Sequence, residues 1–201
     1  MNILGVSEGF HDAGICLLRE NRIHFASHSE RHSRKKGDKW LHKSQLPTTK
    51  INKPDMVVYY EKPFRKNLRR LYAGQKWQKP RHNYDMYFGH HECHAAAGYY
   101  TSPFNECNVL VIDAIGEWDT MSIWDCKDDN MKKRMTWKYP HSLGLLYSAI
   151  THRIGLKPNE DEYITMGMAA FGEPKYDLEN QLWENNHRGV GNIFPEARSE
   201  D

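Results

Sequence analysis

Two histidines spaced four residues apart carry the strongest chemical signal in the sequence, His90 and His94. On an α-helix, residues four apart lie on the same face, so both imidazoles can bind one cation. Two histidines supply only half of a tetrahedral site, and a carboxylate from another segment is needed. Asp113 is the best candidate, because it ends an apolar run typical of a buried strand, where a carboxylate needs a cation or hydrogen-bond donors. Chance placement among 12 histidines is the alternative.

The residues between these histidines do not match a zinc peptidase. His90 is followed by His91 and not by Glu, so the peptidase motif is missing. His91 and Glu92 fall on other faces of the expected helix, and we interpret them as structural.

A second candidate is His11, which stands beside Asp12 in a short turn near the N-terminus. Because an imidazole gains and loses protons near neutral pH, His11 could act as a general base toward an alcohol if this turn faces a cleft. An ordinary surface pair of His and Asp is the alternative. The turn that ends in Gly116, after the strand ending at Asp113, could present backbone N–H groups to phosphate oxygens. No Walker A loop, dinucleotide-binding fingerprint or nucleophile elbow is present in the sequence.

Composition indicates a folded protein whose N-terminal half is suited to binding an anion. Apolar residues make up 39% of the chain, with 6 Trp, 11 Tyr and 7 Phe, which is too aromatic for a disordered chain. Residues 31–43 and 61–81 are strongly basic, whereas the end of the chain is acidic. A basic region suits a nucleotide, a phosphate ester or a nucleic acid, and a solvated surface is the alternative. Apolar residues at helical spacing over 64–72 favour a helix that packs its apolar face on the core and exposes its basic side chains to solvent. Because this explains the basic residues, we do not expect a nucleic-acid partner.

Cysteine usage and hydropathy predict an intracellular protein. The four cysteines lack metal or redox spacing and are expected to be reduced thiols. The first residues reach Glu8 without a signal-peptide apolar region, and no later stretch approaches the length of a membrane span. We therefore expect a cytoplasmic protein that does not bind membranes.

The expected elements follow from the apolar patterns along the chain. Two groups of three strands are predicted, each group joined by short turns. A further strand lies between them, and three helices complete the order, the last with Ser142 as its N-cap. The predicted ranges are strands 3–7, 13–19, 23–29 and 56–60, helices 64–72 and 90–100, strands 109–113, 120–125 and 135–139, and helix 143–154.

The repetition of the three-stranded pattern predicts an α/β chain of two related lobes. An actin/hexokinase-like fold would show such a repeat, with residues 1–105 as its complete first lobe and 106–201 as a partial second lobe. In that fold, the two Gly-containing hairpins face a phosphate between the lobes. A generic α/β domain is the alternative.

Several segments in order resemble the O-carbamoyltransferases of nodulation, cephamycin and tobramycin type. The opening strand with His11-Asp12 and the Glu30-Arg31 segment are similar to that family. The longest match begins at Tyr139-Pro140-His141-Ser142 and continues through helix 143–154 to Tyr176. The other matching segments are 60–64, 90–97, 100–104, 111–113 and 116–118, and the resemblance spans about residues 2–176.

The resemblance implies an actin-like fold related to the tRNA threonylcarbamoyl-transfer enzymes. It implies transfer of a carbamoyl group from carbamoyl-adenylate, formed from carbamoyl phosphate and ATP, to the hydroxyl of a small molecule. His90, His94 and Asp113 would bind a divalent metal, with iron(II) the usual ion, and His11 would be the catalytic base. Lys39 and Gly116 would lie near the nucleotide.

The sequence also departs from that family. Ala114 stands where the family has Gly, and Leu145-Leu146-Tyr147 stand where the tRNA-modifying relatives carry acidic residues, which favours a small-molecule acceptor. Full-length relatives continue beyond the equivalent of Asp201, so we expect a missing C-terminal region or a second polypeptide to supply a further Asp ligand and the donor-making domain. The alternatives are a non-catalytic remnant that binds metal, nucleotide or a partner, and a tRNA-threonylcarbamoylation component.

Overall fold

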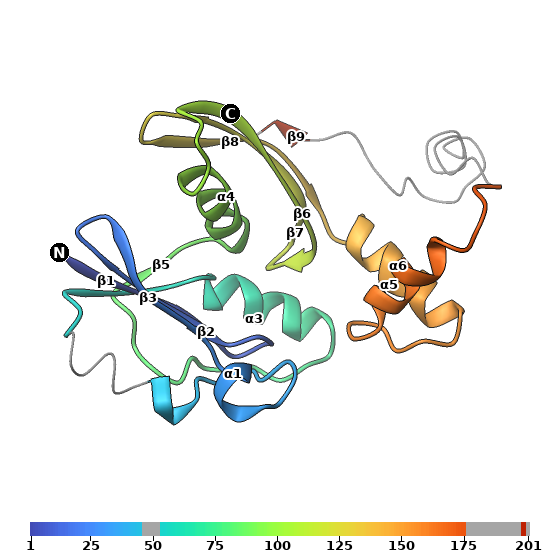
Figure 1. The fold of residues 1–201 in the computed structure, drawn as a ribbon, viewed down its shortest axis with the longest axis horizontal. Helices are drawn as coiled ribbons and strands as arrows, with labels where there is room; N and C mark the ends of the chain where they lie inside the picture. The colour runs from blue at the N-terminus through green and yellow to red at the C-terminus, as the bar shows by residue number, and fades with distance from the viewer. Residues whose placement is uncertain (46–52, 176–197, 200–201) are drawn as a thin grey trace. The chain divides into compact units, whose positions relative to one another are not determined.

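A computed structural model describes residues 1–45, 53–175 and 198–199, and the chain divides into two compact units at residues 93 and 94. Each unit contains one sheet with helices (Figure 1). The architecture is mixed α/β, as the sequence predicts. The actin/hexokinase-like fold and the division at residue 105 stay predictions, and the predicted second lobe extends past residue 175 into residues outside the described ranges.

The sheet of the first unit begins with the predicted three-stranded meander. Strands β1 (Asn2–Ser7), β2 (Gly14–Arg19) and β3 (Arg22–His28) pair antiparallel, and β4 (Met56–Tyr59) adds to β1 in parallel. The order is β3-β2-β1-β4-β5, with β5 (Met86–Tyr87) at the edge. Alternating side chains of these strands, together with Tyr84 from the segment before β5, form the core of the unit, which consists of Leu4, Val6, Ile15, Leu17, Tyr59 and Tyr84. Two short helices follow β3, α1 (Glu30–Ser33) and the 3-10 helix η1 (Lys43–Gln45).

Helix α3 (Pro63–Tyr72) forms close to the predicted range, but the face that it buries is the opposite of the predicted one. Its apolar side chains are exposed, Phe64 at 64% and Leu68 at 43%, whereas Lys66 and Asn67 are buried. The prediction that this helix buries its apolar side chains and exposes its basic ones is therefore wrong. Polar partners explain the orientation, because Lys66 binds Glu61 and the Asn67 amide pairs with the backbone of Gln78.

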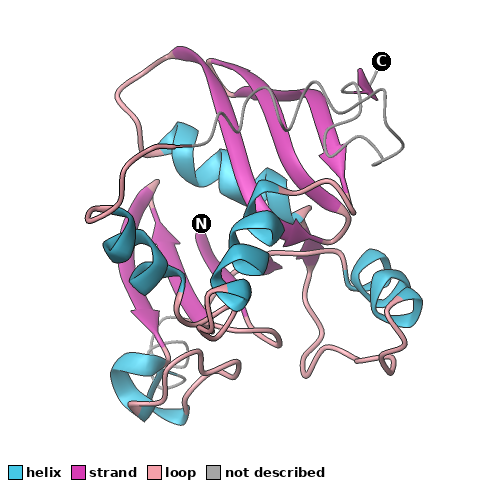
Figure 2. Ribbon diagram, turned by 90° about the vertical axis from the view of Figure 1, so that its right-hand side faces the viewer, coloured by secondary structure: helices cyan, strands magenta, loops and turns pink. Residues whose placement is uncertain are grey.

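The second unit is a four-stranded antiparallel sheet with helices. The predicted strands appear as β6 (Glu106–Gly116), β7 (Asp119–Lys127) and β8 (Asn130–Lys138), the long magenta strands of Figure 2, and β9 (Arg198–Ser199) pairs with β8. Helix α4 (His90–Tyr100) covers one face of this sheet (Figure 1), with Ala95 and Tyr99 in contact with Val111 and Trp124. Leu110 and Ile112 are exposed at 56% and 52%, so β6 is buried on one face only, which corrects the expectation of a fully buried strand.

Two further helices follow the sheet. Helix α5 (Leu143–Arg153) starts at the predicted N-cap, where the Ser142 hydroxyl accepts a hydrogen bond from the N–H of Leu145 at 3.1 Å. Helix α6 (Glu162–Ala169), which the patterns did not predict, pairs with α5 through the Thr151 and Thr165 hydroxyls at 2.9 Å. All four cysteines are free thiols. None of the helices in the described ranges has the length and hydropathy that crossing a bilayer requires.

Candidate metal centre

Helix α4 carries both predicted histidine ligands. The carboxylate of Glu92 accepts a hydrogen bond from the N–H of Gly89 at 2.9 Å, which satisfies a backbone donor at the helix start. Small residues such as Ala95 let the helix lie directly on the sheet. The boundary between the two units falls after the first turn of α4, but the helix continues unbroken across it, so we describe His90 and His94 together as residues of α4.

His90, His94 and Asp113 meet at one point of the structure. One ligand atom from each of the three side chains lies within 4.8 Å of the others. His90 and Asp113 are half-buried and His94 is exposed, which leaves an open side for further ligands. Two imidazole nitrogens and one carboxylate oxygen form a donor set that suits iron(II) or zinc and not calcium or magnesium, which prefer oxygen ligands. The chemistry of the three residues therefore fits the implied metal.

A β-bulge directs Asp113 toward the helix. Strands β6 and β7 pair regularly up to Ile112 and resume only at Gly116, so residues 113–115 lie outside the regular ladder. Bulges turn a side chain away from its regular position and are frequent beside functional sites. One oxygen of the Asp113 carboxylate accepts a hydrogen bond from the N–H of Ala114 at 2.6 Å, which fixes its orientation.

The start of α5 supports this bulge from the other side. The Ser142 hydroxyl lies 2.7 Å from the carbonyl oxygen of Ala114 and 3.2 Å from that of Asp113. Gly144 lies so close that a Cβ there would come within 2.6 Å of the Cα of Ala114. Only glycine permits this approach, so the residue type at position 144 is part of what places Asp113.

The remaining predicted residues occupy separate places. Gly116 ends β6 at the two-residue turn to β7, where Glu117 adopts a positive φ of 57°. Lys39 belongs to the first unit, and its side chain is exposed. Its carbonyl oxygen accepts a hydrogen bond from the N–H of Gly9 at 2.7 Å, which connects its backbone to the turn that carries His11.

His11 is exposed and paired with its neighbour. Its Nδ1 lies 2.5 Å from Oδ2 of Asp12, and the two side chains are 62% and 51% exposed. A carboxylate can only accept, so Nδ1 is the donor in this pair. In the neutral ring, Nε2 then carries the lone pair and can accept a proton from another molecule.

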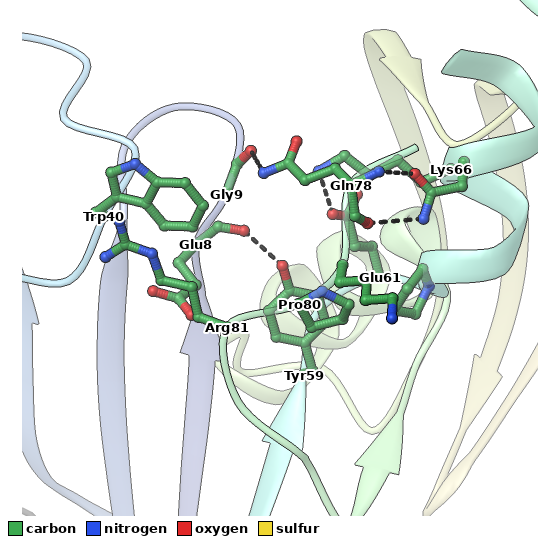
Figure 3. Close-up of a pocket in the computed structure, with 12 residues that line it drawn as sticks. Glu8, Gly9, Trp40, Tyr59, Glu61, Lys66, Gln78, Pro80 and Arg81 are labelled. Atoms are coloured by element: carbon green, nitrogen blue, oxygen red, sulfur yellow. Dashed lines mark hydrogen bonds and ion pairs between the residues drawn. The ribbon is translucent and has the colours of Figure 1, made fainter. Parts of the chain in front are cut away.

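A polar cluster that the sequence patterns did not reveal holds the strand end just before this turn (Figure 3). The Tyr59 hydroxyl donates to the carbonyl of Glu8 at 2.5 Å, and the Tyr84 hydroxyl donates to its carboxylate at 2.9 Å. The Gln78 amide donates to the carbonyl of Gly9 at 3.2 Å. Burial raises the pKa of both tyrosines, with the Glu61 and Glu8 carboxylates adding to the shift for Tyr59 and the hydrogen bond to Glu8 for Tyr84, so both hydroxyls stay donors.

The cavity between these residues is too small for a substrate. Its volume is about 20 Å³, which is enough for about one water molecule and far below the several hundred Å³ of ordinary ligand pockets. At the edge of this cavity, Arg81 stacks on the Trp40 ring, with 3.6 Å between the guanidinium carbon and the ring centroid. The cluster therefore serves to fix the backbone that leads to His11.

Comparisons with known proteins identify similar chains. Residues 55–192 match the family described as "Carbamoyltransferase N-terminus". An uncharacterised protein of Synechocystis is 32% identical over 87% of this chain and 35% of its own length. An uncharacterised protein of Methanocaldococcus jannaschii is 29% identical over 88% of this chain and 34% of its own length. The nodulation protein NolNO of Sinorhizobium fredii is 30% identical over 54% of this chain and 16% of its own length. The chain thus spans about a third or less of these relatives.

Proposed function

The chain belongs to the carbamoyltransferase family through its N-terminal domain, and from this premise we propose that it takes part in O-carbamoyl transfer from carbamoyl-adenylate to the hydroxyl of a small molecule. The convergence of His90, His94 and Asp113 is the observation that carries the proposal. These three residues would hold an iron(II) ion. When bound, such an ion supplies Lewis acidity, which binds phosphate oxygens and polarises a mixed anhydride.

We assign roles to the other predicted residues as part of the same proposal. Nε2 of His11 accepts the proton of the acceptor hydroxyl as its oxygen attacks the carbamoyl carbon. The bond from that carbon to the phosphate oxygen breaks, and AMP leaves with the electron pair. Asp12 keeps Nδ1 of His11 as the donor, so that Nε2 stays available. Lys39 and the turn at Gly116 would lie near the nucleotide.

The metal assignment is tested by iron content. We expect the chain, loaded with iron(II) without oxygen, to hold about one ion, and the His90→Ala/His94→Ala double variant to lose it, because one carboxylate cannot hold the ion alone. The matched control is His152→Ala, an exposed histidine near the end of α5, which should keep the ion. Plasma mass spectrometry of the desalted proteins gives the ratio. Equal iron in the double variant and the wild-type chain would refute the site.

The base assignment is tested by product formation. Synthetic carbamoyl-adenylate is supplied with a panel of hydroxylated acceptors, and mass spectrometry measures carbamoylated product and AMP. We expect His11→Gln to lower the rate by about 100-fold or more, since general-base catalysis contributes on that order, while iron content stays unchanged. A wild-type rate in this variant would overturn the role of His11. Iron binding without transfer to any acceptor would favour a non-catalytic domain.

A further inference from the structure

Four side chains from two segments of the first unit, residues 11–12 and residues 28–30, form a row that starts at the proposed base. Nδ1 of His11 lies 2.5 Å from Oδ2 of Asp12, and Oδ1 of Asp12 lies 3.7 Å from Nε2 of His28. Nδ1 of His28 then lies 3.6 Å from Oε2 of Glu30. Imidazole and carboxylate alternate along the row, and every neighbouring pair lies within ion-pair distance.

The β2–β3 pairing builds this row. His28 is the last residue of β3 and lies across from Gly14, the first residue of β2. A Cβ at position 14 would lie 3.9 Å from Cδ2 of His28, which is ordinary van der Waals contact, so the His28 ring lies beside the backbone of Gly14. The N–H of Ser29 donates to the carbonyl of Ala13 at 2.8 Å, which fixes the strand end next to the turn.

Glu30 closes the row at an anchored position. Its Oε1 accepts a hydrogen bond from the N–H of Gly37 at 2.5 Å, which leaves Oε2 directed at His28. The side chains of His28 and Glu30 are 35% and 29% exposed, whereas that of Asp12 is 51% exposed. The better-buried end of the row is thus held by the backbone, and the more exposed end carries the base.

We propose that His28 and Glu30 are positioning residues that hold the Asp12 carboxylate against Nδ1 of His11. This inference rests on the proposed function of His11 and deepens it. An exposed aspartate in a turn can rotate about its side-chain bonds. Each rotation would break the hydrogen bond from Nδ1 of His11, which keeps the proton of the neutral ring on Nδ1. His28 restrains Oδ1 of Asp12, so that Oδ2 faces His11, and Glu30 restrains the other side of the His28 ring. The arrangement extends the logic of a base that is oriented by a third group.

A divalent cation is the competing explanation for part of this cluster. Ligand atoms of Asp12, His28 and Glu30 lie within 4.8 Å of one another. Each ring nitrogen of His28, however, already faces a different carboxylate. The ring lies between the two carboxylates at ion-pair distance from both, 3.7 Å from Asp12 and 3.6 Å from Glu30. This geometry favours orientation of Asp12 over binding of an added ion.

The test is the tautomer of His11, read from the ring nitrogens by long-range proton–nitrogen NMR of the whole chain. A His11→Gln spectrum assigns the signals. In the wild-type chain we expect the neutral ring to carry its proton on Nδ1, and in His28→Ala and Glu30→Gln we expect a large fraction to move it to Nε2. His24→Ala, at an exposed position of β3, is the matched control and should leave the tautomer unchanged.

The two substitutions make the result decisive. Glu30→Gln keeps the His28 ring in place, so a tautomer shift in this variant does not depend on whether His28→Ala folds. An unchanged His11 tautomer in folded variants at both positions would overturn the proposal. Added Mn²⁺ that broadens His28 signals in the His90→Ala/His94→Ala background would also overturn it, because it would show a cation site.

Turnover gives a second readout that separates this proposal from the proposed function. With carbamoyl-adenylate and a productive acceptor from the panel, Glu30→Gln should lower kcat by about tenfold and leave KM unchanged, the size typical of outer residues that orient a reacting group. Glu30→Asp should restore part of the rate. If the wild-type chain transfers no carbamoyl group, the proposed function fails, whereas the NMR result still decides the role of His28 and Glu30.

Discussion

Tyr84 shows how a single hydroxyl supports the region that carries the proposed base. It donates at 2.9 Å to the carboxylate of Glu8, which is only 2% exposed. Hydrogen bonds to buried charged groups are worth more than neutral ones, because losing the donor leaves the charge less well solvated. The nearby ring of Tyr59, stacked on Tyr84 at 4.4 Å between centroids, adds packing but cannot replace this donor.

We therefore expect Tyr84→Phe to lower the free energy of unfolding by about 1.5–3 kcal/mol. Tyr100→Phe is the matched control, since it removes one hydrogen bond, to the carbonyl of Asp129 at 3.1 Å, at an exposed position. That control should change stability by less than about 0.5 kcal/mol. Urea unfolding followed by circular dichroism measures both. Equal effects of the two substitutions would show that Glu8 does not depend on Tyr84.

At the scale of elements, the close approach of α5 to the bulge in β6 determines the place of Asp113. A Cβ on Gly144 would lie 2.6 Å and 2.7 Å from Cα and N of Ala114 and 2.9 Å from the carbonyl carbon of Asp113. All three are backbone atoms, which cannot move without shifting the helix or the bulge. The metal-binding carboxylate would move with them.

Gly144→Ala should therefore destabilise the chain by about 1–3 kcal/mol, as overpacking does. It should also weaken iron binding by about tenfold, because supporting contacts orient a metal ligand. Gly167→Ala in α6 is the control, because nothing lies within 4 Å of the added methyl group. That change should leave iron binding unchanged and raise stability by about 0.4–1 kcal/mol. Wild-type stability and iron affinity in Gly144→Ala would contradict this account.

The elements also show which features the sequence could predict. Both meanders, the helix that carries His90 and His94, and the Ser142 cap follow local patterns and agree with the structure. The spacing on α4, the carboxylate near the end of an apolar run and the family resemblance together selected His90, His94 and Asp113, whose ligand atoms lie together, whereas their binding of a metal stays a prediction. The orientation of α3 was not predictable, because Lys66 and Asn67 are buried by partners at Glu61 and Gln78 that no periodicity reveals. The row from His11 to Glu30 depends on the β2–β3 register, which brings His28 beside the turn.

The chain as a whole responds to alkaline pH through its buried tyrosines. Burial raises the pKa of Tyr59, Tyr60 and Tyr84, and the nearby carboxylates of Glu61 and Glu8 add to the shift. In the unfolded chain a tyrosine ionises near pH 10. Above that pH, the unfolded state releases protons that the folded state still holds. The contribution of these hydroxyls to stability is therefore complete below about pH 10 and decreases as pH rises toward the folded-state pKa.

We expect the free energy of unfolding to fall steadily above about pH 10, and to fall less steeply in Tyr60→Phe, which removes one of the tyrosines whose pKa is raised. Tyrosinate absorbance near 295 nm gives an independent measure. Signals of Tyr59, Tyr60 and Tyr84 should appear only together with the loss of native circular dichroism, because their hydroxyls ionise when the chain unfolds. Ionisation of all tyrosines near pH 10 with the native spectrum retained would show that these hydroxyls are open to solvent, and that the cluster beneath the His11 turn is looser than its hydrogen bonds indicate.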